Sequence, residues 1–183
     1  LEHAFRQKHY DCLLSCTNRD LAARRQGVEL LTSRHVDGMV LMGSTFIEEK
    51  SEENDYIRQA ATNVPVVLLN GSFQCPNVFC VLCDDERAMK EAMNQLLDSG
   101  CKLVLYLYHS SNKSGQRKLA GCRDALAAHK LPVDETLMRR FDADKFSIHA
   151  VRDCLMELER EGLQFDAVLA SEDVLAVGAM KYA

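Results

Sequence analysis

The sequence predicts an α/β fold made of two consecutive units, each a parallel β-sheet flanked by helices. Short apolar runs, long enough for a strand but too short for a helix, alternate with longer segments whose apolar residues recur at helical spacing. The run 66–69 (VVLL) is apolar throughout, as expected for a parallel strand buried on both faces. The connections are short, which favours β-α-β units in one parallel sheet over separate layers.

Length and composition bound the possible classes of protein. The chain has 183 residues, of which 47% are hydrophobic and 27% charged, so it can form one large or two small folded units with a substantial core. Its net charge is −5 with acids and bases interspersed, so we do not expect this chain by itself to bind nucleic acid. No apolar run reaches membrane-spanning length and no signal peptide is visible, so no membrane is expected as a partner.

The first unit is predicted over residues 1–82. The polar turn 17–20 can cap the helix that follows it, and Pro65 ends a later helix because proline disfavours helix at the residue before it. The expected elements are the end of a helix over 1–9, a strand over 10–16, a helix over 21–33, a strand over 39–42, a loop at 43–45, a helix over 48–63, and strands over 66–69 and 78–83.

The second unit, over residues 83–183, repeats this pattern. Gly100 suits the left-handed position after a helix, and Gly162 ends another helix. The expected elements are a helix over 84–99, a strand over 102–108, a helix over 114–129, a weak strand over 137–141, a helix over 146–161, a strand ending at residue 170 and a helix from residue 174. The chain begins and ends within helices that have no polar caps, so we expect a piece of a larger protein.

Eight cysteines lie in apolar segments rather than in loops rich in glycine or proline. Cys80 and Cys83 have the C-x-x-C spacing, but residues three apart on a strand point to opposite faces. Cys12 and Cys16 share a predicted strand face about 13 Å apart. No histidine pairing with zinc spacing accompanies either pair, so we expect no metal site and interpret the cysteines as small buried hydrophobes in a reducing cytoplasm.

Catalytic signatures are absent. The sequence contains no G-x-S-x-G elbow, no phosphate-binding G-x-x-x-x-G-K-[ST], no G-x-G-x-x-G and no H-E-x-x-H. Its six histidines are scattered, mostly at predicted surface positions or turns. We therefore expect a protein that is not an enzyme, with no catalytic residues and no cofactor.

Polar residues follow the predicted strands at their carboxyl ends, and in a parallel sheet these ends lie on one edge. Such groups suit a polyhydroxylated or heterocyclic small molecule held by directional hydrogen bonds, although the same residue types also favour turns for local reasons. Asp173, where a strand meets a helix, is the first candidate. The set comprises Asn18, Ser44, Asn70, residues 109–112, Glu172 and Asp173.

Arg117 and Lys118 are predicted near the start of a helix, where cations oppose the macrodipole. Local stability does not explain them there, so we expect them to face an acidic or hydroxylated group, such as Asp173 or a ligand. The alternative is that their long side chains reach solvent.

Four segments, VDGMVL (36–41), VPVVLLN (64–70), KLAG (118–121) and SEDVLAVGA (171–179), occur in an order and spacing that extend along essentially the whole chain. Together they resemble the effector-binding domain of LacI/GalR-type bacterial transcription repressors, which are similar to periplasmic sugar-binding proteins. The resemblance implies a periplasmic-binding-protein-like fold of two Rossmann-like lobes, incomplete in this chain.

The resemblance also implies a function. We expect a cytoplasmic, homodimeric regulator that binds a small-molecule effector, a sugar or related metabolite, in the cleft between its lobes. Ligand occupancy would control operator DNA binding by a helix-turn-helix headpiece absent from this chain. The alternative is a periplasmic sugar-binding protein of an ABC transporter, against which eight apparently unpaired cysteines argue.

The family's pattern implies roles for seven residues. Asp173 matches the family's ligand-binding aspartate, and Lys118 stands where the family usually has arginine, a substitution that removes a planar two-pronged donor. The other five expected ligand contacts are Asn70, where an aspartate often occurs, Ser44 in a pocket-lining loop, Arg117 beside Lys118, Glu172 in place of an asparagine, and Phe141 near the family's aromatic stacking position.

Overall fold

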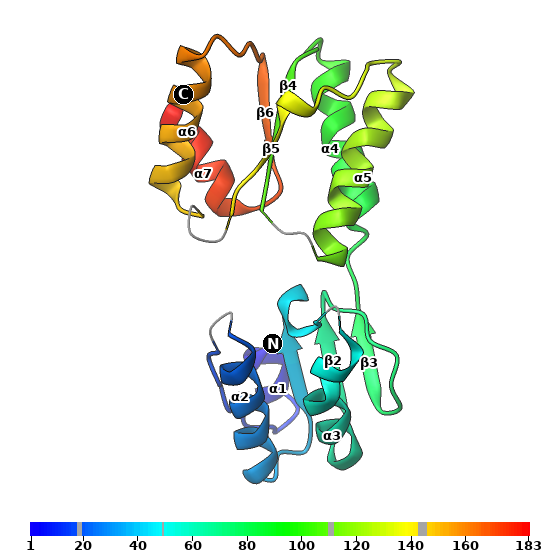
Figure 1. The fold of residues 1–183 in the computed structure, drawn as a ribbon. Coiled ribbons are helices and arrows are strands. Elements are labelled where there is room, and N and C mark those ends of the chain that lie inside the picture. Colours follow the sequence, from blue (N-terminus) through cyan, green and yellow to red (C-terminus); the bar gives the residue numbers. More distant parts are fainter. Residues whose placement is uncertain (18–19, 49, 110–111, 143–145) are drawn as a thin grey trace. The chain divides into compact units, whose positions relative to one another are not determined.

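The computed structural model describes residues 1–17, 20–48, 50–109, 112–142 and 146–183, and it divides into two units, Leu1–Cys83 and Asp84–Ala183 (Figure 1). Each unit holds a three-stranded sheet with helices packed on it. The strand orders are β1-β2-β3 and β5-β4-β6, and all neighbouring strands pair in parallel. The α/β fold with parallel sheets that the sequence predicts is confirmed.

In unit 1, α2, β1 and β2 have the bounds that the sequence predicts. The side chain of Asp20 caps α2 by accepting the Ala23 N–H at 2.9 Å. The elements are α1 (Glu2–Arg6), α2 (Leu21–Ser33), β1 (Met39–Met42), η1 (Ser44–Phe46), η2 (Ser51–Asn54), α3 (Asp55–Asn63), β2 (Val66–Leu69) and β3 (Val78–Val81).

The helix predicted over 48–63 begins only at Asp55. The buried amide of Asn54 accepts the Glu48 N–H at 2.8 Å and donates to the carbonyls of Glu48 and Lys50. These bonds close a compact turn in place of the first helical turns, because an asparagine side chain can satisfy backbone groups that a helix would otherwise use.

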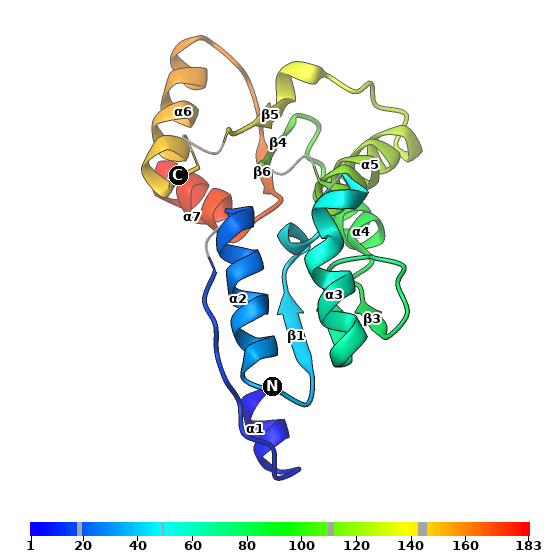
Figure 2. The ribbon, with the colours of Figure 1, turned by 60° about the horizontal axis from the view of Figure 1, so that its bottom comes forward.

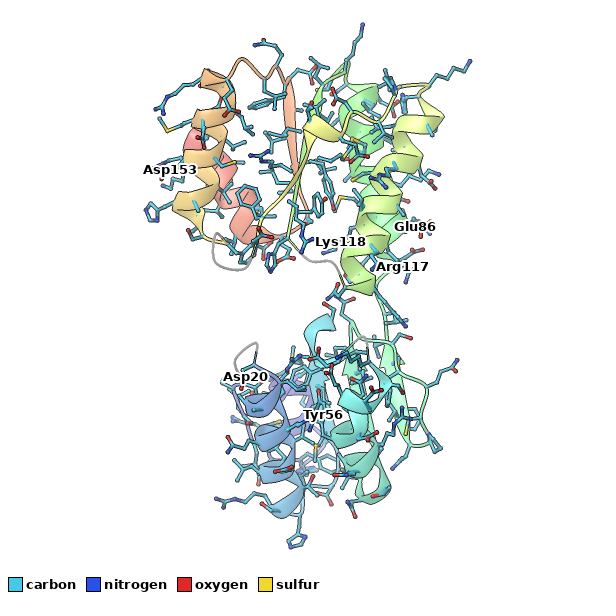
Figure 3. All side chains as sticks on the ribbon, viewed as in Figure 1. Asp20, Tyr56, Glu86, Arg117, Lys118 and Asp153 are labelled. Atoms are coloured by element: carbon cyan, nitrogen blue, oxygen red, sulfur yellow. The ribbon has the colours of Figure 1, made fainter. Side chains whose placement is uncertain are left out.

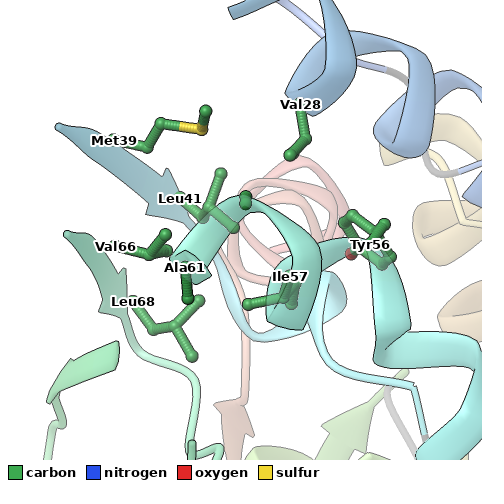
Figure 4. Close-up of a cluster of buried hydrophobic side chains, with 9 residues drawn as sticks. Val28, Met39, Leu41, Tyr56, Ile57, Ala61, Val66 and Leu68 are labelled. Atoms are coloured by element: carbon green, nitrogen blue, oxygen red, sulfur yellow. The ribbon is translucent and has the colours of Figure 1, made fainter. Parts of the chain in front are cut away.

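Helices α2 and α3 cover one face of the first sheet. The cluster between them joins Val28 of α2, strand residues such as Leu41 and Leu68, and Tyr56 and Ile57 of α3 (Figure 4). The opposite face carries large exposed apolar side chains, those of Met42, Phe79 and Val81.

The strand predicted over 10–16 is wrong, because residues 10–17 form no strand in the structure. The segment runs along α2 (Figure 2), where Ser15 and Thr17 fill the space beside Gly27. A strand needs a hydrogen-bonded neighbour, and among the described residues β1 pairs with β2 alone. Leu13 and Leu14 are consequently both exposed, at 61% and 88%, although a buried strand would cover at least one of them.

In unit 2, the helices cover both faces of the sheet (Figure 1). Alternate residues of β4 point to opposite sides, so Tyr106 packs with α4 and α5 while Leu105 and Leu107 pack with α6 and α7. The elements are α4 (Asp85–Asp98), β4 (Val104–Tyr108), α5 (Lys113–Ala128), η3 (Glu135–Leu137), β5 (Met138–Arg140), α6 (Ile148–Arg160), β6 (Ala167–Ala170) and α7 (Asp173–Tyr182). Gly100 adopts positive φ after α4, as predicted, and Gly162, predicted to end a helix, also adopts positive φ after α6.

The interpretation of the cysteines as buried hydrophobes is correct only in part. Cys122 is buried, but Cys12, Cys16, Cys80 and Cys83 are exposed, and all eight are free thiols. The exposed four lie in the unpaired segment 10–17 and on or after the edge strand β3, where no described element covers them. Within the described ranges, no group of three or more His, Cys, Asp or Glu side chains could hold a metal ion, and no helix there could span a membrane.

Candidate functional site

The carboxyl ends of β4, β5 and β6 lie at one edge of the second sheet, because the three strands run parallel. We call the residues at and just after the ends of these strands, 108–109, 141 and 171–173, the carboxyl edge of unit 2. Helices α5, α6 and α7 begin just beyond it. Helix N-termini carry a partial positive charge, so this edge favours negatively charged or hydrogen-bond-accepting groups.

Two predicted acids, Glu172 and Asp173, stand at the start of α7. Asp173 is its exposed first residue, and Glu172 is the N-cap residue, with extended backbone and no side-chain capping bond. Among the described residues, no lysine, arginine or histidine lies within ion-pair distance of either carboxylate. Both carboxylates therefore retain acceptor capacity for another molecule.

The sequence suggested that Lys118 faces an acidic or hydroxylated group such as Asp173. In the structure Lys118 instead contacts the backbone just before Asp173. Its ammonium Nζ donates to the carbonyl oxygen of Ser171 at 3.0 Å. Because α5 begins at Lys113, Lys118 lies in its second turn, and its side chain is on the side of the helix that faces the sheet (Figure 3).

Arg117 lies on the other side of α5 (Figure 3). Its guanidinium pairs with Asp84 at 3.3 Å, and both side chains are largely exposed. The Asp84 carboxylate also caps α4 by accepting the Arg87 N–H at 3.3 Å. The structure thus separates the two cations that the sequence places together.

His109 of the carboxyl edge of unit 2 pairs with an aromatic residue that lies shortly before α6. The rings of His109 and Phe146 are stacked at a tilt, with centroids 4.2 Å apart. His109 Nδ1 lies 2.8 Å from the carbonyl oxygen of Phe141, and because a carbonyl only accepts, Nδ1 carries the proton. Phe146 was not among the site residues predicted from the sequence. Its position shortly after β5, as an aromatic residue at this edge, was the signal that could have indicated it.

The Phe141 side chain packs into the core of unit 2 and is 5% exposed. Its N–H donates to the Tyr108 carbonyl at 2.8 Å, which extends the pairing of β4 and β5 by one residue. Phe141 therefore presents backbone rather than ring at this edge.

Under the edge lies a small buried polar group. Tyr106 is fully buried, and its hydroxyl lies near Ser171 and Cys122 without hydrogen-bond geometry to either. Burial is the main cause that raises the pKa of this phenol. Burial likewise raises the pKa of the Cys122 thiol, to about 12. Neither group ionises near neutral pH, so neither supplies a nucleophile there.

In unit 1, Asn70 and Ser44 follow β2 and β1. Asn70 adopts a positive φ of 61°, which asparagine tolerates, and its N–H donates to the Val81 carbonyl at 2.7 Å. Ser44 begins η1, and the Tyr56 hydroxyl holds that turn by donating to the Phe46 carbonyl at 2.7 Å. The predicted residues Asn18, Ser110 and Ser111 lie outside the described residues.

The loop that follows η1 is fixed by a buried cation. Arg24 of α2 is 5% exposed and pairs with Glu48. The neighbouring Arg25 donates to the Glu53 carbonyl at 3.3 Å. These contacts join the loop to α2 and so limit where Ser44 can move.

Comparisons with known proteins give a consistent result. The family model of periplasmic binding proteins and the sugar-binding domain of the LacI family matches residues 1–183. An HTH-type transcriptional regulator from Lachnoclostridium phytofermentans is 41% identical over 182 residues, which is 100% of this chain and 54% of the regulator. Catabolite control protein A from Staphylococcus xylosus is 28% identical over 171 residues, covering 92% of this chain and 49% of that protein.

A solved structure of similar fold is described as a putative ribose operon repressor from Burkholderia thailandensis. It superposes with a TM-score of 0.79 at 26% identity and covers 99% of this chain and 64% of its own. The chain spans about half the length of the curated relatives it matches.

Proposed function

The chain belongs to the family of periplasmic binding proteins and sugar-binding domains of LacI-type regulators, and on that basis we propose that it is the effector-binding part of a bacterial transcription regulator. The observation that carries this proposal is the relative at 41% identity, a regulator matched along the whole of this chain. Both relatives compared above are named for regulation rather than transport, which favours a regulator over a transport protein.

We propose that the effector is a sugar or a related hydroxylated metabolite and that Asp173 is its principal acceptor. A carboxylate accepts hydrogen bonds from sugar hydroxyls, and bonds to an ionised partner are stronger than neutral ones. Asp173 is exposed and has no ion-pair partner among the described residues, so its oxygens are available. Glu172 supplies a second carboxylate beside it, and the pair of His109 and Phe146 supplies an aromatic surface.

In unit 1 we propose Ser44 and Asn70 as further effector contacts. Both follow parallel strands at their carboxyl ends, where ligands of α/β sheets bind. The fixed loop around Ser44 and the tight backbone at Asn70 would hold these polar groups in one geometry, which reduces the entropy lost on binding.

The whole protein is proposed to act as a cytoplasmic homodimer that binds operator DNA through a helix-turn-helix headpiece outside this chain. The support for the headpiece is the description of the 41% identical relative as an HTH-type regulator. Effector binding would then shift the population of a DNA-binding state.

The proposal is tested by calorimetric titration of the full chain with a panel of monosaccharides, disaccharides and nucleosides. We expect heat with at least one sugar. In Asp173→Ala the loss of a charged acceptor should weaken that binding by about 10- to 150-fold, equivalent to about 1.5–3 kcal/mol.

The matched control is Asp153→Ala, which removes an exposed aspartate of α6 (Figure 3) that pairs with its neighbour Arg152. It should bind the sugar as the native protein does. No heat with any sugar would refute the effector class, and native affinity in Asp173→Ala would remove this residue from the site.

A further inference from the structure

Lys118 connects two parts of unit 2 that are far apart in sequence. Its ammonium donates to the carbonyl of Ser171, 53 residues away, at the point where β6 has ended and α7 has not begun. The contact is partly buried. Within the described part of the chain, no carboxylate lies within ion-pair distance of Lys118, so this carbonyl is the group that receives its charge.

The peptide groups around Ser171 are held on both sides. On the sheet side, the Ser171 N–H donates to the Leu107 carbonyl of β4 at 2.9 Å. On the helix side, its carbonyl receives Lys118. The next carbonyl, that of Glu172, accepts the N–H groups of Leu175 and Ala176 and thereby starts α7. Fixing the Ser171 carbonyl therefore fixes the direction in which the chain enters the helix.

The start of α7 lacks the side-chain N-cap hydrogen bond that fixes the start of four other helices. The side chains of Asp20, Asp84, Asn112 and Ser147 cap α2, α4, α5 and α6 by accepting a backbone N–H. The side chain of Glu172 makes no such bond. Without a capping side chain the first turn of a helix frays readily, so another contact has to hold this junction.

A cation is an unfavourable neighbour for a helix N-terminus, whose partial charge is also positive. The cost is offset here because Glu172 and Asp173 place two carboxylates at the same helix start. Neither acid is ion-paired with Lys118, so the lysine does not consume the acceptors that an effector would use.

We propose that Lys118 is a positioning residue: its ammonium holds the Ser171 carbonyl, fixes the junction between β6 and α7, and so sets the direction in which Asp173 is presented to an effector. This role deepens the proposed function and rests on it. It differs from direct contact between Lys118 and the effector, in which the ligand-free junction would not depend on the lysine.

The test is amide hydrogen exchange of the full chain without effector, followed by peptides covering residues 163–176. Lys118→Met keeps the apolar stem and removes the donor. We expect exchange in these peptides to accelerate by about ten- to a hundredfold, as expected for loss of a charged hydrogen bond that limits local opening. Lys118→Arg, whose guanidinium can donate to the same carbonyl, should restore slow exchange.

The control is Lys90→Met. Lys90 also forms a contact between elements of unit 2, 3.5 Å from Asp124 of α5, but away from the junction. Its loss should leave peptides 163–176 unchanged. Native exchange in Lys118→Met, or equal acceleration in both variants, overturns the positioning role.

A measurement on the native protein tests the proposal even if Lys118→Met does not fold. In the side-chain ammonium region of a ¹⁵N spectrum, Lys118 should give a slowly exchanging signal, whereas the exposed Lys113 at the start of α5 should not. Fast exchange of both signals overturns the proposal. Absence of sugar binding by the native protein would instead refute the proposed function and leave these exchange results intact.

Discussion

Two tyrosine hydroxyls in the cores of this protein have opposite surroundings. Tyr56 of unit 1 is 5% exposed and donates to the Phe46 carbonyl at 2.7 Å. Tyr106 of unit 2 is 0% exposed, and its hydroxyl has no hydrogen-bond partner among the residues that the structure describes. A buried hydroxyl stabilises a fold only when the hydrogen bond it made with water is replaced.

We expect Tyr56→Phe to lower the free energy of unfolding by about 1–3 kcal/mol, because the Phe46 carbonyl would lose its donor inside the protein. Urea unfolding monitored by circular dichroism measures this. The turn that carries Ser44 should also exchange its amides faster. An unchanged unfolding midpoint would show that water replaces the phenol at no cost.

The same substitution at Tyr106 should behave differently. Tyr106→Phe removes a polar atom that has lost water and gained no partner, so we expect unchanged stability or a gain of up to about 1 kcal/mol. The measurement is the same urea series. A loss as large as that of Tyr56→Phe would mean that the Tyr106 hydroxyl is bonded in solution, to Ser171 or to Cys122.

At the scale of residues, the sequence was informative where a site residue is adjacent to a strand end. Glu172 and Asp173 could be placed because the apolar run before them and the helical pattern after them are both local. The partner of Lys118 could not, because a backbone carbonyl 53 residues away leaves no trace in residue types. The partner expected for it was an acidic or hydroxylated group, such as Asp173 or a ligand, and the structure supplies a peptide carbonyl.

Helices α4 and α5 pack closely because Gly121 has no side chain. A Cβ at this position would lie 2.1 Å from the carbonyl oxygen of Glu86 in α4 and 3.0 Å from the Lys90 nitrogen (Figure 3 labels Glu86). Both are backbone atoms, which cannot move without shifting the helix. The approach of the two helices sets where α5 holds Lys118.

Gly121→Ala should therefore lower the free energy of unfolding by about 1–3 kcal/mol or more, because the overlap outweighs the gain of about 1 kcal/mol in helix propensity. Gly27→Ala in α2 is the matched control. There the new methyl group meets the Thr17 side chain at 2.7 Å, in a segment that forms no strand or helix, so the segment can shift.

Thermal and urea unfolding of both variants provide the test. We expect Gly27→Ala to be near neutral and Gly121→Ala to be clearly destabilised, with faster amide exchange in α4 and α5. Equal stability of the two variants would show that α4 and α5 can separate at little cost.

At the scale of elements, the predictions succeeded where local sequence decides the structure. The bounds of α2, β1 and β2 follow from a cap, a helical pattern and two apolar runs, all of them short-range signals. The failures depend on distant or side-chain contacts. The segment 10–16 has the composition of a strand but pairs with no other strand in the described part of the chain, and the segment before α3 is folded by the amide of Asn54.

For the whole molecule, alkaline pH makes the net charge of −5 more negative, and the resulting repulsion destabilises the fold. We expect a larger loss of stability than this repulsion alone would cause. Burial is the main cause that raises the pKa of Cys122 from 9.0 to about 12 and that of Tyr56 from 10.0 to about 12. Each group stays protonated in the folded state while the unfolded chain loses its proton first. The unfolded state then binds fewer protons, so stability falls as pH rises through the window between the two pKa values.

The resulting prediction concerns Cys122, because its window begins at a lower pH than those of Tyr56 and Tyr106, whose pKa values burial also raises. The contribution of Cys122 to the free energy of unfolding is complete below about pH 9. It should decrease by about 2 kcal/mol by about pH 10.5, since each unit of pH within the window corresponds to about 1.4 kcal/mol. Urea unfolding of the native protein and of Cys122→Ala at about pH 8 and pH 10.5 isolates this part. The variant is less stable at about pH 8 because a buried sulfur is lost, but its stability should fall less with pH, by about the 2 kcal/mol that Cys122 contributes. The contributions of Tyr56 and Tyr106 remain in both proteins. If the two proteins lose the same stability between these pH values, the Cys122 thiol is not the group that makes the fold sensitive to alkali.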